Sequence, residues 1–408
     1  MNDKRRSATS IVGLSAVIVI ISVGTRQSLG LFLAPISADL GVGREVFSLA
    51  IAIQSLIFGL PFVGVLADRY GPRWVVVGGG LLYATSLALL AFISAPIGLY
   101  LGLGVLAGIA LSCTGYVVIL GAIAQVVPVE KRSTSFGIVT AAGSVGMLAV
   151  VPGVQWTLNQ VGWQKTFIVM ALFVASIALI ALALPARPGS EQSGDDGSVA
   201  DEPMIDVLKK AGRHSGYLLL TAGFFVCGFH VAFIATHLPA FLADNGVASM
   251  IGAVALALIG FANIFGSYTF GALGDHYRKK YLLSFLYFGR SVVITLFILF
   301  PVTNVTALVF SAAIGFLWLA TVPLTSGTIA QIFGSRYLST LYGIVFFSHQ
   351  IGAFLGVWLG GRVYDNSGSY APVWLAAIAL GIVAGLLHLP ITDRPLPTQT
   401  AESIEVAA

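Results

Sequence analysis

The sequence predicts an all-α integral membrane protein in which twelve transmembrane helices form two pseudo-symmetric six-helix bundles. Its composition and an internal repeat carry this prediction. Of the 408 residues, 57% are hydrophobic and only 9% are charged, whereas soluble domains average about 25% charged residues. Only helices and closed barrels satisfy every backbone group inside a bilayer, so continuous apolar runs of about 20 residues indicate membrane helices.

The second observation is a duplication at a separation of about 206 residues. The residues that recur are Ser133, Thr134, Gly137, Ile138, Val139 and Gly146, which return as Ser339, Thr340, Gly343, Ile344, Val345 and Gly352. Two repeated helix bundles that face each other across a central cavity are a recurring design of secondary transporters. The duplication therefore predicts transport before any single residue does.

The apolar runs between charged or turn-forming breaks number twelve, six in each half. They cover roughly 10–35, 44–66, 74–94, 98–127, 133–158, 163–185, 217–243, 248–273, 281–301, 305–333, 338–361 and 370–391. The hydrophilic stretch 186–215 is predicted to be a flexible cytoplasmic linker. This leaves 1–185 as the first six-helix bundle and 216–408 as the second, which ends in a short cytoplasmic tail.

The placement of Lys and Arg predicts the orientation of the chain, because cytoplasmic loops collect these residues. If the N-terminus lies inside, sixteen of the 21 basic residues fall on inner segments, and only Arg44, Lys165 and Arg362 fall outside. Both termini are thus predicted to be cytoplasmic, in a multi-pass protein of the inner membrane. The first apolar run lacks a small-residue cleavage pattern at its end, so we expect a retained span and not a cleaved signal.

Several protein classes are excluded by what the sequence lacks. Cys113 and Cys227 lie inside apolar runs, which fits neither a disulfide framework nor a metal site. No phosphate-binding loop, zinc-protease motif or serine-hydrolase elbow is present. The net charge of +4 follows from topology and does not indicate a nucleic-acid partner. We expect no enzyme activity, no cofactor and no metal.

Two loops carry related charged motifs. The loop after the second run reads Gly64 to Arg73, with Asp68 and Arg69 at its centre, and the loop after the eighth run places Asp275 and Arg278 similarly. The pattern G-x-L-A-D-R-x-G-x-R, with a degraded second copy, resembles the major facilitator superfamily. This resemblance implies the twelve-helix fold. A short charged turn that fixes topology would explain one copy, but two copies at matching places favour a gate.

The gating hypothesis assigns five residues. An Asp at a helix end can accept hydrogen bonds from a neighbouring helix N-terminus and pair with Arg, which would latch the cytoplasmic face in one state. The residues assigned to this gate are Asp68, Arg69, Arg73, Asp275 and Arg278.

Within the superfamily, segments in the first and seventh runs are similar to bacterial members of the monocarboxylate and oxalate/formate porter group. These segments are Gly24 to Leu33 and Phe229 to Pro239. The resemblance implies small organic anions as cargo, often moved with protons. The chain departs from the pattern in the eighth run, where no Asp or Arg occurs, and in the eleventh, which offers His349 where the oxalate/formate exchanger has a Lys.

Arg26 is the leading candidate for substrate binding. It lies some sixteen residues into the first run, near the bilayer midplane. A charge at this depth costs at least about 2.5–3.5 kcal/mol on insertion scales and usually faces a cavity or a partner. Snorkelling toward the outer surface is the alternative. Because no carboxylate occurs in the middle of any run, an anionic substrate is the predicted counter-ion, held by a bidentate pair.

Arg290 is also deep, about ten residues into the ninth run. The superfamily plan places that helix outside the cavity. Two interpretations stay open: a structural clamp onto backbone or polar groups of a neighbouring helix, and a second anion ligand.

His230 and His349 lie near the middle of the seventh and eleventh runs. A lone histidine in an apolar helix is often a packing residue. The functional alternative is that these are the mid-membrane groups able to titrate near neutral pH. They are therefore the candidates for binding substrate and carrying protons, with Asp39 and Asp244 at the outer side as entry points.

Smaller polar and aromatic residues complete the predicted cavity, although such residues also serve as glue between membrane helices. They are Gln27, Tyr116, Asn263, Trp318 and Gln350.

The sequence therefore predicts a monomeric secondary transporter that moves a small organic anion, a monocarboxylate above all, by alternating access. Proton symport and anion exchange both stay open, so protons and membrane lipid join the anion as expected partners. Drug or metabolite efflux by proton antiport is the alternative, but it would require a membrane-embedded Asp or Glu to hold positive cargo. A membrane-embedded signalling or enzymatic protein is a remote alternative.

Overall fold

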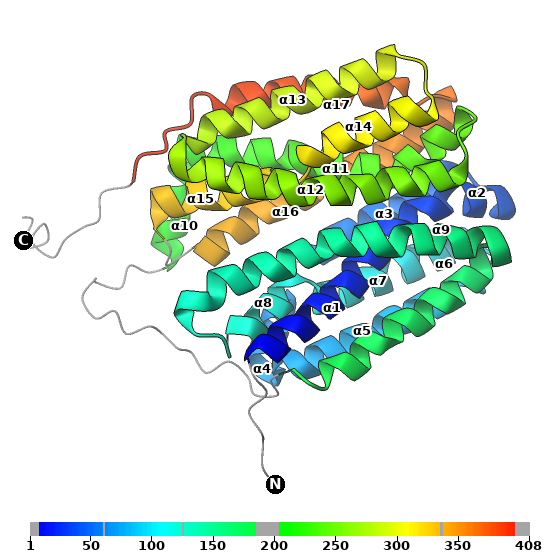
Figure 1. Cartoon of the computed structure of the whole chain (residues 1–408), viewed down its shortest axis with the longest axis horizontal. Helices are drawn as coiled ribbons and strands as arrows, with labels where there is room; N and C mark the ends of the chain where they lie inside the picture. The colour runs from blue at the N-terminus through cyan, green and yellow to red at the C-terminus, as the bar shows by residue number, and fades with distance from the viewer. Residues whose placement is uncertain (1–7, 60–61, 125, 185–203, 335–337, 396–408) are drawn as a thin grey trace, which may run out of the picture.

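The computed structural model describes residues 8–59, 62–124, 126–184, 204–334 and 338–395. Every regular element within these ranges is a helix, so the predicted all-helical membrane fold is confirmed. Figure 1 shows the helices up to α9 gathered in one bundle, and those from α11 to α17 in a second bundle beside it.

The first bundle begins with a nearly continuous segment that runs through Leu40. Its elements are α1 (Ala8–Ser28), η1 (Leu29–Phe32), α2 (Leu33–Leu40), α3 (Arg44–Phe58), α4 (Phe62–Tyr70), α5 (Pro72–Leu90), α6 (Pro96–Leu99), η2 (Tyr100–Leu106), α7 (Ala107–Thr114), α8 (Tyr116–Ala124) and α9 (Val129–Ala181).

The second bundle follows a short helix, α10 (Met204–Arg213). Its elements are α11 (Ser215–Asp244), α12 (Ser249–His276), α13 (Lys279–Leu299), α14 (Asn304–Phe316), α15 (Thr321–Phe333), α16 (Leu338–Ser367) and α17 (Ala371–His388). The predicted run 305–333 is thus broken between Phe316 and Thr321.

Ten segments of the described chain are long and apolar enough to cross a membrane. One of them, Ser135–Ala181, holds two predicted runs that meet at Gly162, whose φ of 78° lies in the left-handed region that favours glycine. A further predicted run, 44–66, corresponds to α3 and α4 on either side of residues outside the description. Counting Ser135–Ala181 as two spans and adding α3 with α4 as one more brings the ten segments to the twelve predicted runs.

The predicted linker 186–215 is wrong in its second part. Residues Met204–Arg213 form helix α10, and Val207 and Ala211 on one face of it are buried against the second bundle. Their i, i+4 spacing places both side chains on the same side of the helix, which is why this polar segment folds. Residues 186–203 lie outside the described part of the chain.

The repeated glycines of the sequence have matching structural roles. A Cβ on Gly146 of α9 would collide with the backbone oxygen of Ile20 in α1, and a Cβ on Gly352 of α16 would collide with that of Phe225 in α11. These glycines let the fifth helix of each half touch the first helix backbone to backbone.

The two bundles contact each other mainly along two helix pairs, α3 with α16 and α9 with α12, and α11 also contacts η1 and α2. We define the outer end as the end of the molecule that holds the α2–α3 and α11–α12 connections, and the inner end as the opposite one. The names follow the orientation predicted from the basic residues.

Replacing Gly146 or Gly352 by Val should lower the thermal unfolding midpoint of the purified protein, because overpacking a tight contact costs about 1–3 kcal/mol. At Gly137 and Gly343, from the same repeat, a Cβ would meet no atom within 4 Å. Val at those positions is the matched control and should leave the midpoint nearly unchanged. Equal midpoints for all four variants would show that the close approach is not required.

Candidate functional site

Arg26 lies between α1 and α3, close to the contact between the two bundles. Its Nη2 donates to Ser55 Oγ at 3.4 Å, and its guanidinium carbon lies 4.6 Å from the ring centroid of Phe58. A pocket of about 30 Å³ adjoins it. The pocket is lined by Arg26, Gln27, Leu29, Gly30, Ile51, Ser55, Ala232, Ala235 and Thr236. The first bundle therefore supplies the cation, and α11 of the second bundle supplies the facing wall.

This Arg26 pocket is electrostatically one-sided. Among the residues that line it, Arg26 is the only charged one. The phenol groups of Tyr83 and Tyr116 lie near Arg26, and the buried hydroxyl of Tyr83 has no hydrogen-bond partner among the described atoms. The site thus offers an uncompensated guanidinium with a free phenol nearby, an arrangement suited to an incoming anion.

The pocket is too small for a carboxylic acid in this conformation. A volume of about 30 Å³ is about the share of one molecule in liquid water. Admission of a substrate therefore requires α11 to move away from α1 and α3.

Of the two predicted residues Gln27 and Tyr116, only Gln27 lines the Arg26 pocket. The Nε2 of Gln27 lies 3.6 Å from Met147 Sδ. Tyr116 donates to the Thr140 carbonyl at 3.5 Å while remaining near Arg26. Ser55, Phe58, Tyr83 and Thr236 were not predicted. Small hydroxyl and aromatic residues are common in membrane helices, so no spacing distinguishes these four.

Gln350 of α16 reaches the contact between the bundles, whereas the ring of His349 lies against Phe224 and Phe346 within the second bundle. A Cβ on Gly59 would lie 2.6 Å from Gln350 Cγ, so Gln350 packs against the end of α3. His349 stacks on Phe346, with ring centroids 5.8 Å apart. Among the described atoms, His349 Nδ1 and Gln350 Oε1 are buried without a hydrogen-bond partner.

His230 points the other way. Its Nε2 lies 2.7 Å from the Ala377 carbonyl of α17. At about 100° per residue, His230 falls on the face of α11 opposite Ala232 and Ala235, which line the Arg26 pocket. The sequence of an apolar helix does not show which of its faces meets the cavity, so the direction of His230 could not be predicted. The structure places His230 in the packing of the second bundle and not beside Arg26.

Trp318 lies in the break between α14 and α15, and Asn263 of α12 binds to that break. Asn263 Nδ2 donates to Ser144 Oγ at 2.9 Å across the two bundles, and its Oδ1 accepts the Leu319 N–H at 2.8 Å. Trp318 is buried. Neither residue lines the Arg26 pocket, so both hold the broken helix in place there.

Arg290 makes the contacts that the clamp interpretation requires. Its Nε and Nη2 donate to the Leu317 carbonyl at 3.1 and 2.8 Å, and Nη2 also donates to the Trp318 carbonyl. These carbonyls follow the end of α14, where helix geometry leaves acceptors unpaired. No α13 residue lines the Arg26 pocket, so the described contacts do not support a second anion ligand there.

The charged loops at the inner end make bonds within their own bundles. Arg73 donates to the Leu184 carbonyl at 2.7 Å, and Lys280 donates to the Ile391 carbonyl at 2.9 Å. The two donors, Arg73 and Lys280, are 207 positions apart in the sequence, and the two acceptors, Leu184 and Ile391, are separated by the same 207 positions. In each half, a cation at the start of the third helix therefore binds a carbonyl just after the sixth.

Arg278 adds a bidentate pair to the same region of the second bundle. It binds Asp393 at 2.6 and 3.3 Å and holds the pKa of that carboxyl below its ordinary value. In this conformation the described bonds of Arg73 and Arg278 stay within their own bundles, and their predicted gating role stays a prediction. Arg69 lies over Tyr70, and Asp275 is exposed. The side chain of Asp68 lies outside the described residues.

A latch between the bundles occurs instead at the outer end. Arg44, at the start of α3, forms a bidentate pair with Asp244 at the end of α11, with both distances 2.7 Å. Asp365, near the end of α16, accepts the backbone N–H groups of Arg44 and Glu45 at 2.9 and 2.8 Å. Glu45 in turn accepts from Arg362 at 3.0 Å. We call these five residues the outer latch.

The outer latch is asymmetric although the chain is duplicated. Asp39 and Asp244 are equivalent in the repeat, but Asp39 accepts from Trp163 at 3.1 Å inside the first bundle. The position equivalent to Arg44 in the second half is Ser249, since 44 + 205 = 249. The Arg that makes the latch therefore has no repeated counterpart.

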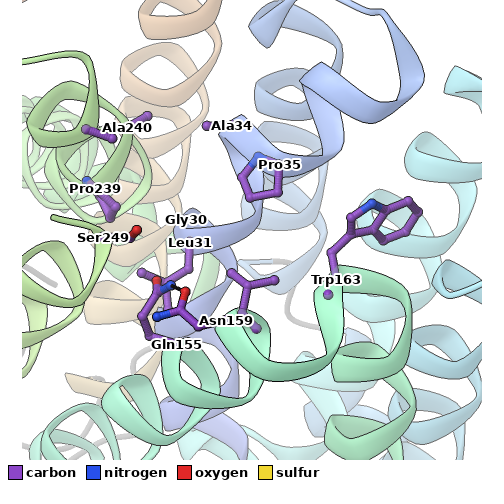
Figure 2. A pocket seen from close by; sticks show the side chains of 13 residues that line it. Gly30, Leu31, Ala34, Pro35, Gln155, Asn159, Trp163, Pro239, Ala240 and Ser249 are labelled. Carbon is purple, nitrogen blue, oxygen red and sulfur yellow. Dashed lines mark hydrogen bonds between the residues drawn. The ribbon is translucent and has the colours of Figure 1, made fainter. Parts of the chain in front are cut away.

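A larger cavity of about 340 Å³ opens near the outer end (Figure 2). It shares Gly30 with the Arg26 pocket, and its lining contains no charged side chain. In Figure 2, Gln155 and Asn159 lie beside Leu31, and Pro239 and Ser249 come from the second bundle. Arg26 lines the smaller pocket and not the larger cavity.

The chain was compared with known families and proteins. The family model described as "Major Facilitator Superfamily" matches residues 15–357 and 250–405. An uncharacterized MFS-type transporter, YcxA, of Bacillus subtilis (strain 168) is 26% identical over 391 residues, which is 93% of this chain and 94% of the relative. Monocarboxylate transporter 13 of Rattus norvegicus is 26% identical over 352 residues, 85% of this chain and 79% of the relative.

Two solved structures share the fold. A bacterial homolog to the human lysosomal transporter Spinster, in an inward-facing and occupied conformation, matches with a TM-score of 0.76 at 15% identity, over 95% of this chain and 98% of the other. A D-xylose-proton symporter matches with a TM-score of 0.75 at 14% identity, over 95% and 99%.

Replacing Arg44 by Gln should open the outer end in a larger fraction of molecules. An ion pair of this exposure contributes about 1 kcal/mol, which corresponds to roughly a fivefold change in the ratio of closed to open states. The measurement is the distance distribution between spin labels at the exposed positions Val161 and Val305. Asp244→Asn should act in the same direction.

Asp39→Asn is the matched control, because it removes the repeat-related carboxylate whose described bonds stay within the first bundle. It should leave the distances unchanged. Identical distributions for Arg44→Gln and the parent would contradict the role of the outer latch.

Proposed function

The chain belongs to the Major Facilitator Superfamily, and from this premise we propose that it carries a small organic anion, a monocarboxylate, by alternating access. It is a multi-pass membrane transporter and not an enzyme. The proposal about its cargo rests on one observation: Arg26 is the only charged group lining a pocket between the two bundles. Placement in the inner membrane with both termini cytoplasmic is part of the proposal.

In the proposed mechanism, the substrate carboxylate supplies the charge that the pocket lacks. A guanidinium binds a carboxylate with two parallel hydrogen bonds, which are roughly twice as strong as neutral ones. The remaining lining is apolar or neutral, which suits one carboxylate and a short uncharged tail. A second carboxylate on the cargo would face groups that cannot pair with it.

Alternating access would proceed by motion of one bundle against the other around Arg26. The outer latch holds the two bundles together at one end, while the described charged bonds of the inner loops stay within each bundle. In the described conformation the outer latch is formed. Release of the outer latch would admit the anion, and its restoration would accompany delivery to the inside.

Monocarboxylate transporters among the relatives support the same cargo, whereas efflux of a cationic drug does not fit the charge of the pocket. A cation would meet Arg26 with no acidic side chain in the lining to hold it. Efflux of a drug or metabolite by proton antiport is thus ranked second, after anion transport, as the function of this chain.

Arg26→Gln should reduce uptake of labelled pyruvate or lactate into reconstituted vesicles by about 10- to 100-fold, because hydrogen bonds to charged groups contribute about 1.5–3 kcal/mol. Arg26→Lys should retain part of the activity, since it keeps the charge and loses the bidentate geometry. Lys165→Gln is the control, because it removes an exposed cation on the outer side that belongs to neither the pocket nor the outer latch, and it should leave uptake unchanged. Full uptake by Arg26→Gln, with a normal melting curve, would refute the anion site.

His349 is the proposed proton carrier, because its ring stacks on Phe346, which contacts Phe58 of the first bundle, and its Nδ1 has no hydrogen-bond partner among the described atoms. An inward proton gradient should drive accumulation of pyruvate in vesicles of the parent. The His349→Gln variant should lose this response while it retains exchange of pyruvate across the membrane. His230→Gln is the matched control and should keep the response, since His230 binds α17. Equal uptake with and without the gradient in the parent would favour anion exchange over symport.

A further inference from the structure

A row of aromatic rings connects Arg26 to the second bundle. The guanidinium carbon of Arg26 lies 4.6 Å from the centroid of Phe58, the last residue of α3. Phe58 meets Phe346 of α16 edge to face, with centroids 6.0 Å apart. Phe346 stacks on His349 at 5.8 Å and 8°. The row therefore crosses from the cation of the first bundle to the proposed proton carrier of the second.

Phe58 lies on the inner side of the Arg26 pocket. Ser55 lines that pocket, and Phe58 follows it by about one helical turn, about 4.5 Å farther from the outer end. The ring is held in its slot on the side of the first bundle, because a Cβ on Gly115 would lie 3.0 Å from Phe58 Cε2. Phe346 contacts it from the second bundle. The pair thus occupies the route from Arg26 toward the inner end.

The contact between Arg26 and Phe58 also has an electrostatic function. A cation over an aromatic face is attracted by the negative face of the ring. This gives the guanidinium a neutral partner while the pocket is empty and holds no carboxylate. A carboxylate forms the stronger, bidentate bond, so a bound anion would compete with the ring for the guanidinium.

We propose that Phe58 and Phe346 form an inner aromatic gate beneath Arg26, and that binding of an anion by Arg26 frees Phe58 and lets the gate open. The gate itself stands on the ring geometry, while its trigger rests on the proposed function. Phe58 is a positioning residue in this scheme: it contacts the cation and the opposite bundle at the same time.

The test measures access to the pocket without requiring transport. Cys113 and Cys227 are buried and can be replaced, and Ala232→Cys then places a thiol in the pocket lining. Labelling by a membrane-impermeant maleimide is measured in inside-out vesicles. With the gate intact, labelling should be slow. Phe58→Leu or Phe346→Leu should increase its rate at least tenfold in the absence of any anion.

Three comparisons control this experiment. Phe58→Tyr keeps the ring and should keep the thiol protected. Phe354→Leu removes another α16 ring, which pairs with Trp358, and should also leave it protected. Addition of millimolar pyruvate should accelerate labelling severalfold with Phe58 present and should have no effect in Phe58→Leu.

The gate and the cargo can fail separately. Equal labelling rates for Phe58→Leu, Phe346→Leu and the parent would overturn the gate, whatever the cargo is. Fast labelling of the Leu variants, together with no effect of pyruvate on the parent and full uptake by Arg26→Gln, would sustain the gate and overturn its trigger and the anion site.

Discussion

One unpaired cation organises the site of this protein. Arg26 is surrounded by a hydroxyl, an aromatic ring and apolar groups, and no acidic residue lines its pocket. Holding such a charge inside a membrane is costly, and the ring of Phe58 together with the phenol groups nearby offsets this cost only in part. In the proposed function, an anion would supply the missing charge, and the energy of that pairing would be available to shift the two bundles.

The duplicated chain builds two similar bundles, and function depends on where the copies differ. Gly146 and Gly352 make the same backbone contact in each half, and Arg73 and Lys280 bind matching carbonyls. These repeated features make each half rigid. Arg26 and Arg44 are not repeated, and they supply the site and the outer latch. Rigid halves with unique contacts between them are what a rocking motion requires.

The sequence was sufficient to predict the fold because membrane helices are specified by composition, which needs no knowledge of neighbours. Arg26 could be singled out for the same reason, since a deep charge is conspicuous. The facing direction of a helix residue could not be obtained in this way. His230 and His349 look alike in sequence, but one binds α17 and the other stacks on Phe346, and an apolar helix has no polar face to reveal which.

The outer latch shows the same limit for charges in loops. Asp39 and Asp244 are indistinguishable by motif, and their different partners follow from Arg44, which is distant from both Asp244 and Asp365 in the sequence. A pairing over such a separation is set by how the bundles close and not by local spacing. Because the outer latch and the row of rings at Arg26 both join α3 to the second bundle, α3 links the outer end to the Arg26 pocket. In the proposed mechanism, release of the outer latch and opening of the rings would therefore both act on this one helix.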